Sequence, residues 1–330
     1  MVGAANPGSL LDALDEPALV VVKGRIQAAN RSALAMLGPD IVGRDHRLGI
    51  RHPQVLATIA LGESADVAVI GIGGSERPWH VAVRPLGDGG GCLVRFIDRA
   101  ESLAAERMRV DFVANASHEL RTPLATISGY AETLAEPDVP AELRRTFART
   151  IATEAARMLR IIEDLMSLSR IEASRFVVPS DRCDLGELAC EAAVQVAPLA
   201  ERRECPVQLD IDDKAPVTIA ADAPQMLQVI DNLLSNAIRY GGSGVVLSVG
   251  VEHGRPLLRV RDSGPGIAPV HLPRLTERFY RIDDARSRGS GGTGLGLAIV
   301  KHIVERHRGT IDIQSRIGEG TVVTITLPPA

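Results

Sequence analysis

Aromatic residues are scarce in this 330-residue chain, at 3% of the sequence. Its hydrophobic cores must therefore be built mainly from aliphatic side chains. Only four cysteines occur, and no two of them stand in a Cys-x-x-Cys spacing. This usage favours a reducing compartment in which the thiols stay free and pack as small apolar groups.

Long apolar runs are also absent. No stretch approaches the roughly 20 residues that a membrane helix requires, and the N-terminus lacks the basic and apolar segments of a secretory signal. We therefore expect a cytoplasmic protein, or the cytoplasmic part of a sensor whose membrane anchor precedes Met1. The net charge of −4 gives no basic excess, so we expect no nucleic-acid partner.

The sequence otherwise has the composition of a globular protein, with 45% hydrophobic and 24% charged residues. Its length suggests two or three domains. The residue pattern changes near Asp98 and again near Pro179. We therefore expect domains at residues 1–98, 99–178 and 179–330.

The first region alternates short strands with short helices. A β-rich hairpin is expected around Lys23-Gly24, and Asn30 is a candidate N-cap for a helix that starts at Arg31. The further elements expected here are a helix at 53–60 and strands at 65–72, 80–85 and 92–97. This order resembles a PAS domain, which implies a sensor or dimer-forming module. A scaffold without a ligand fits the same pattern.

Two long helices are expected next, at 107–134 and 141–174, joined by a proline-containing break. Each carries a narrow apolar stripe, and such a hairpin cannot bury its stripe alone. We therefore expect a homodimer through residues 107–174, with two hairpins forming a four-helix bundle. The charged residues expected on the opposite face of the second helix are Arg144, Arg145, Arg149, Glu154, Arg157 and Glu163.

The first of these helices contains the string S-H-E-L-R-T-P-L, which places His118 beside Glu119. Pro123 lacks an N–H group, and its ring crowds the carbonyl group of Glu119. The helix is therefore expected to bend or loosen just after His118. An exposed histidine beside a carboxylate is a candidate nucleophile with a base.

From Pro179 onward the pattern is that of an α/β sandwich, with one mixed sheet and helices on one face. The expected helices are 185–200, 224–240 and 295–307, and the expected strands are 206–211, 217–220, 245–252, 256–262, 309–315 and 320–327.

Three motifs in this region suit a nucleotide. Asn232 and Asn236 stand four residues apart and share a helix face with Arg239. Asp262 ends a strand before a Gly-Pro-Gly turn, and a glycine-rich loop precedes the last helix, where free N–H groups would bind an anion. Alone, each motif also fits a solvated helix face or an ordinary turn.

The order of the motifs N-L-L-S-N-A, D-S-G-P-G-I, E-R-F-Y-R and G-T-G-L-G-L, with S-H-E-L-R-T-P-L upstream, resembles the sensor histidine kinases of two-component systems. The resemblance covers residues 107–330. It implies a multidomain α+β fold with a PAS-like domain, a dimeric helical hairpin and the ATP-binding sandwich shared with DNA gyrase. It also implies autophosphorylation from Mg-ATP and transfer to an aspartate of a response regulator.

The resemblance implies a role for each matching residue. His118 would accept the phosphoryl group, Glu119 would act as its base, and Arg281 would reach the γ-phosphate from a lid anchored by Phe279. Asn236 would hold Mg²⁺. The nucleotide contacts implied are Asn232, Asn236, Arg239, Tyr240, Asp262, Gly264, Gly266, Gly292, Thr293, Gly294, Leu295 and Gly296.

Thr122 lies one helical turn after His118. In the family, a threonine there positions water for dephosphorylating the regulator. The alternative is that Thr122 is an ordinary surface residue.

Segments around Asp111 and Lys301 resemble phosphate-regulon sensor kinases more narrowly. Two other functions remain open, a scaffolding protein whose ATP site only holds conformation and a regulator that acts mainly as a phosphatase. The remaining histidines are interpreted as structural or surface residues, namely His46, His52, His80, His253, His271, His302 and His307.

Overall fold

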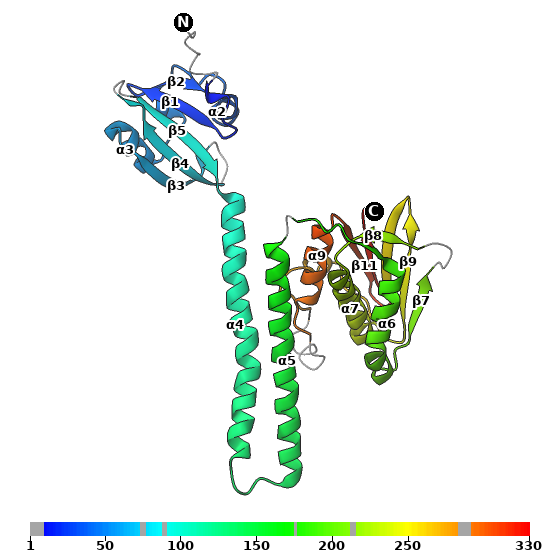
Figure 1. The fold of residues 1–330 in the computed structure, drawn as a ribbon. Coiled ribbons are helices and arrows are strands. Elements are labelled where there is room, and N and C mark those ends of the chain that lie inside the picture. Colours follow the sequence, from blue (N-terminus) through cyan, green and yellow to red (C-terminus); the bar gives the residue numbers. More distant parts are fainter. Residues whose placement is uncertain (1–9, 73–76, 88–90, 175–176, 212–215, 283–291) are drawn as a thin grey trace. The chain divides into compact units, whose positions relative to one another are not determined.

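The computed structural model describes residues 10–72, 77–87, 91–174, 177–211, 216–282 and 292–330. The chain forms two compact units, Met1–Asp111 and Phe112–Ala330. Helix α4, Ala100–Leu134, belongs to both (Figure 1).

The first unit is built on a five-stranded antiparallel sheet with the order β2-β1-β5-β4-β3. The expected hairpin forms at Lys23-Gly24, where both residues have positive φ angles, as the tight turns of β-hairpins require. The strands and helices are β1 Ala18–Val22, β2 Arg25–Ala29, α2 Arg31–Leu37, α3 Pro53–Leu61, β3 Ala65–Ile70, β4 Pro78–Pro85 and β5 Gly91–Asp98, with a 3₁₀ turn at His46–Leu48.

Asn30 connects the N-terminal segment, β1 and α2 of the first unit. Its side chain is 1% exposed. The Oδ1 atom accepts hydrogen bonds from the N–H groups of Ala18 and Ala33, both at 2.9 Å, and the second of these caps α2 as expected. The Nδ2 group donates to backbone carbonyls at 2.8–3.2 Å, those of Leu11, Leu14 and Glu16.

Replacing Asn30 by alanine is expected to lower the free energy of unfolding of the first unit by about 3 kcal/mol, because several buried backbone groups lose their partner together. Denaturant unfolding followed by the fluorescence of Trp79, the single tryptophan, would measure this, since Trp79 packs against that unit's core. The matched control is Gln27→Ala, an exposed amide on β2. Equal stability of the two variants would contradict this role for Asn30.

The second unit begins with a helical hairpin formed by residues 112–134 of α4 and by α5, Ala141–Ala173. The hairpin was expected from the two apolar stripes. Its second helix contributes Leu168 and Ile171 to the same core as the α/β domain, so α5 is packed onto that domain. Helix α4 continues through the buried Pro123 without a break; a change in its direction there stays a prediction.

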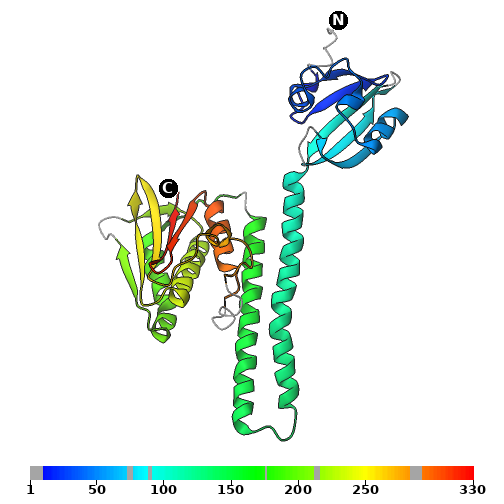
Figure 2. The same ribbon diagram turned by 180° about the vertical axis from the view of Figure 1, so that it is seen from behind.

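The α/β domain has the expected mixed sheet, in the order β11-β12-β10-β9-β7, in which only β7 and β9 pair in parallel. Helices α6, α7 and α9 lie on one face of it (Figures 1 and 2). The elements are β6 Arg182–Asp184, α6 Leu185–Arg202, β7 Val207–Ile211, β8 Thr218–Ala220, α7 Ala223–Tyr240, β9 Val245–Glu252, β10 Arg255–Asp262, α9 Gly296–Arg306, β11 Thr310–Arg316 and β12 Gly320–Thr326, with a 3₁₀ turn at Leu272–Arg274.

One strand lies elsewhere than expected. The segment expected as a strand at 217–220 forms β8, which pairs with the three-residue strand β6 in a separate two-stranded sheet. The mixed α+β architecture expected from the sequence is otherwise confirmed for the hairpin and the α/β domain.

Candidate functional site

His118 is exposed on α4, and the neighbouring Glu119 is partly buried. The Oε2 atom of Glu119 accepts a hydrogen bond of 2.8 Å from Arg157 Nη2 on α5. Arg281 of the α/β domain brings its Nη1 atom within 3.8 Å of the same oxygen. The structure thus assembles the histidine, the candidate base and the candidate phosphate-binding arginine from two parts of the second unit.

Arg157 is the residue that the sequence pattern placed wrongly. It was expected among the charged residues on the outer face of the second helix, yet it is 6% exposed. Its guanidinium group is paired with Glu119 and lies 3.8 Å from Glu154. A buried arginine is stable only with such carboxylate partners, and a helical pattern does not reveal a partner 38 residues away.

Thr122 lies on the turn after His118, and its side chain is exposed. Its hydroxyl group donates a hydrogen bond of 3.3 Å to the carbonyl oxygen of His118. The bond is a long one for a hydroxyl donor. The Thr122 side chain therefore lies one turn from His118 and is accessible from solvent.

Asp262 ends β10 where the sequence placed it. Its Oδ1 atom accepts hydrogen bonds from the N–H groups of Gly264, at 2.9 Å, and Thr321, at 3.2 Å. Burial raises the pKa of the Asp262 carboxyl group, and these two backbone hydrogen bonds oppose that rise. The carboxyl group is thus fixed in orientation. Gly266, with a positive φ angle, packs against the backbone of Arg316 in the turn that follows.

Asn232 and Asn236 lie on α7, as expected, and both are partly buried. Asn232 also contacts the glycine loop, because a methyl group added to Gly296 would lie 2.9 Å from its Oδ1 atom. A side chain at position 296 would therefore require the Asn232 side chain to move. Residues 232 and 296 therefore belong to one site.

Arg239 and Tyr240 end α7 beside the same loop. Burial lowers the pKa of the Arg239 guanidinium group, and the positive charge of Arg160 lowers it further. The Tyr240 side chain is exposed, and its hydroxyl oxygen would lie 2.9 Å from a methyl group added to Gly292. The end of α7 therefore contacts the loop that precedes α9.

The described part of the glycine loop leads into α9. Gly294 has a φ angle of 72°, which favours glycine, and its carbonyl oxygen accepts a hydrogen bond of 2.8 Å from the N–H group of Phe279. Leu295 is fully buried. The expected lid between Arg281 and Gly292 lies outside the described residues at 283–291.

Contacts between the hairpin and the α/β domain were not foreseen from the sequence. Thr293 donates a hydrogen bond of 2.7 Å to Asp164 on α5. The guanidinium group of Arg278 is paired with Glu172 and stacks over the ring of Phe112 at 5.3 Å. The Phe112 ring in turn lies 5.9 Å from that of Phe279. No sequence motif marks these pairs, since each joins segments more than 100 residues apart.

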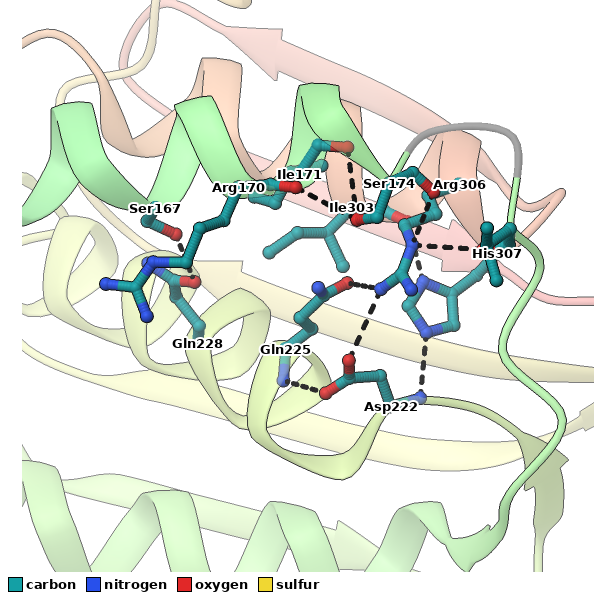
Figure 3. A network of polar contacts seen from close by, with 11 residues as sticks. Ser167, Arg170, Ile171, Ser174, Asp222, Gln225, Gln228, Ile303, Arg306 and His307 are labelled. Carbon is teal, nitrogen blue, oxygen red and sulfur yellow. Dashed lines mark hydrogen bonds and ion pairs between the residues drawn. The ribbon is translucent and has the colours of Figure 1, made fainter.

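A further polar network joins the end of α5 to the α/β domain (Figure 3). The Nε atom of Arg306 donates to the carbonyl groups of Ser174 and Val177, at 3.3 and 3.1 Å. Its Nη1 atom donates to Asp222 at 3.3 Å and to Gln225 at 2.7 Å. Arg306 thereby ties the segment after the hairpin to the first turn of α7.

His307 belongs to this network and is buried, with 1% of its surface exposed. Its Nε2 atom accepts a hydrogen bond of 3.0 Å from the N–H group of Asp222, so Nδ1 carries the proton and donates to the carbonyl oxygen of Ile303 (Figure 3). Burial lowers the pKa of the imidazole, which favours this neutral form. His307 is therefore structural, as expected.

Two domain families match this chain. Residues 108–174 match the His Kinase A (phospho-acceptor) domain, and residues 221–330 match the histidine kinase-, DNA gyrase B- and HSP90-like ATPase. The hairpin that carries His118 is thus a phospho-acceptor domain, and the α/β domain is an ATPase of the histidine kinase type. The chain belongs to the sensor histidine kinases of two-component systems.

The chain is also similar to named sensor proteins. The phosphate regulon sensor protein PhoR of Pseudomonas aeruginosa is 38% identical over 243 residues, which cover 72% of this chain and 54% of PhoR. The sensor protein SrrB of Staphylococcus aureus is 34% identical over 242 residues, which cover 72% of this chain and 41% of SrrB. The chain thus spans about half the length of these relatives.

Solved structures agree in fold. The Acinetobacter baumannii histidine kinase AdeS matches with a TM-score of 0.51 and 25% identity, over 64% of this chain and 98% of AdeS. The histidine kinase ThkA, solved in complex with the response regulator protein TrrA, matches with a TM-score of 0.56 and 21% identity over 98% of each chain. The second likeness concerns the fold alone. Within the described residues, no helix is long and apolar enough to span a bilayer.

Proposed function

We propose that this protein is an autokinase that phosphorylates His118 with the γ-phosphoryl group of ATP. The observation that carries the proposal is the convergence of Arg281, from the ATPase domain, on Glu119 beside the exposed His118. In the reaction the unprotonated imidazole nitrogen forms a bond to the γ-phosphorus, and the bond from phosphorus to the β,γ-bridging oxygen breaks. ADP leaves with the bond's electron pair.

The roles of the chain's own groups follow from this chemistry. Glu119 would take the proton from the imidazole, as a base that orients a nucleophile does. Arg281 would neutralise charge on the transferred group. Since Glu119 is held by Arg157 in this arrangement, it would have to turn toward His118 when the nucleotide arrives.

The hydrogen-bonding groups and oxygen ligands of the site are of the kinds that ATP and Mg²⁺ require. Asp262 would accept a hydrogen bond from the adenine amino group, and the N-terminal turn of α9 would bind phosphates. In the part of the chain that the structure describes, no cluster of three or more His, Cys, Asp or Glu residues could hold a metal. Mg²⁺ would instead be bound by Asn236 together with phosphate oxygens, and it would neutralise their charge.

The direct test is incubation of the full chain with γ-labelled ATP and Mg²⁺. We expect label that is stable to base and lost in acid, as a phosphorus–nitrogen bond requires. A wild-type chain without such label, when its fold is intact, would refute the proposal.

We propose a homodimer through residues 107–174. Apolar side chains of the hairpin that a second copy would cover are exposed in the single chain, among them Val113 (58%), Leu124 (51%) and Leu159 (60%). Pairing two hairpins in a four-helix bundle would bury them. Light scattering at micromolar concentration should give twice the chain mass, and a monomer would contradict this part of the proposal.

The phosphorylated histidine would pass its phosphoryl group to an aspartate of a response regulator, as membership of the two-component family suggests. The 38% identity to PhoR supports a phosphate-related signal. We place the sensing role in residues 1–98, where the sheet order and the Asn30-capped helix support a PAS-like domain. Residues 99–178 and 179–330 would be the phosphotransfer and catalytic domains.

A phosphatase activity toward the regulator would depend on Thr122, whose accessible side chain lies one turn from His118. Thr122→Ala is expected to reduce regulator dephosphorylation at least tenfold while labelling of His118 changes less than about threefold. Release of phosphate from a phosphorylated regulator measures this. Thr126→Ala, one turn along the same helix, is the control. Full phosphatase activity in Thr122→Ala would exclude the role.

A further inference from the structure

Asp164 of the hairpin helix α5 contacts the nucleotide loop directly. Its Oδ2 atom accepts a hydrogen bond of 2.7 Å from the hydroxyl group of Thr293. The same hydroxyl oxygen accepts a hydrogen bond of 3.2 Å from the N–H group of Leu295. Asp164 is therefore linked through the Thr293 side chain to the N–H group of Leu295, the N-cap of α9.

Asp164 is a partly buried carboxyl group with cations near it. Burial raises its pKa, whereas the hydrogen bond from Thr293 and the guanidinium groups of Arg160, on α5, and Arg239, at the end of α7, oppose that rise. These two arginines repel each other, so a negative group that attracts both offsets part of that repulsion. The positive end of α9 favours negative charge as well. Glu163, the neighbouring carboxylate on α5, is exposed and repels Asp164.

The phosphate chain of ATP would need these same groups. In the proposed function it binds at the glycine loop and the start of α9, where Thr293 and Leu295 lie. Two anions cannot share one set of cations and N–H groups without strong repulsion in a partly buried site. The carboxylate of Asp164 and the phosphates therefore compete.

We propose that Asp164 is a positioning residue that takes the place of an ATP phosphate and holds the glycine loop against the hairpin until nucleotide displaces it. This inference rests on the proposed nucleotide site. ATP binding would break the bond between Asp164 and Thr293 and release the ATPase domain from this part of α5. By linkage, the docked arrangement lowers the affinity for ATP by the same factor by which ATP weakens docking.

The test uses the full chain and two probes, a non-hydrolysable ATP analogue with Mg²⁺ and adenosine, which lacks phosphates. Asp164→Asn keeps the side-chain shape and removes the charge. We expect it to bind the triphosphate about five- to tenfold more tightly than wild type, with the adenosine affinity unchanged. Asp164→Ala should do the same, and it serves as the second variant. Calorimetric titration of wild type and of the two variants with each probe measures these affinities.

Glu163→Gln is the matched control, because it removes an adjacent but exposed carboxylate. It should bind both probes as wild type does. Triphosphate affinity in Asp164→Asn that is equal to or weaker than wild type, with adenosine binding retained, would overturn the inference and leave the proposed function standing. A wild-type chain that binds neither probe would overturn both.

Discussion

Replacing His118 by glutamine is expected to reduce ATP-dependent labelling of the chain at least about a thousandfold, because the nucleophile itself is removed. Glutamine has good helix propensity, so α4 should stay intact. His118 is exposed, and its loss should leave ATP-analogue binding and thermal stability unchanged. Base-stable label measured after gel separation reports the reaction.

The matched control is His253→Asn. His253 is an exposed histidine in the β9–β10 turn with a φ angle of 52°, a conformation that asparagine tolerates. This variant should be labelled like wild type. Base-stable label that persists in His118→Gln would exclude His118 as the acceptor.

The second large effect is expected at Asp262. Asp262→Asn should weaken ATP binding at least about a hundredfold, because a site that loses a hydrogen bond to its ligand and leaves polar groups unpaired loses several kcal/mol. The carboxylate already accepts from the N–H groups of Gly264 and Thr321 through Oδ1. An amide oxygen can keep those bonds only by turning its NH₂ group toward the adenine amino group, where two donors oppose each other.

The same variant should narrow the preference for ATP over GTP. Guanine carries a carbonyl oxygen where adenine has its amino group, and the side-chain amide that Asp262→Asn introduces could donate to it. Competition titrations with both nucleotides measure the ratio. Asp312→Asn, an exposed carboxylate on β11, is the control for charge. An unchanged ratio of the two affinities would show that Asp262 does not contact the base.

Glu119 contacts arginines from both the hairpin and the ATPase domain. Its carboxylate lies between Arg157 and Arg281, so the groups proposed as base and as phosphate ligand neutralise each other in this arrangement. ATP would provide a stronger anion for Arg281, which would leave Glu119 with Arg157 alone.

Much of the fold was predictable because its signals are local. The turn at Lys23-Gly24 formed where expected, since glycine adopts a positive φ angle without steric cost. Asn30 caps α2 through its own side chain. The small sheet of β6 and β8 was not predicted, because a three-residue strand carries too little alternation to be recognised.

The sequence by itself determined the class of protein and the positions of His118, Asp262 and the glycine loop. Those residues stand in motifs whose spacing follows helix and strand periods. Only the tertiary structure decided what lies beside them. Arg157 is buried and donates a hydrogen bond to Glu119. Asp164 accepts a hydrogen bond from Thr293, which lies 129 residues away in the sequence. The physical reason is that charge pairing in a folded protein depends on distance in space and on burial, and neither is encoded in the periodicity of one helix.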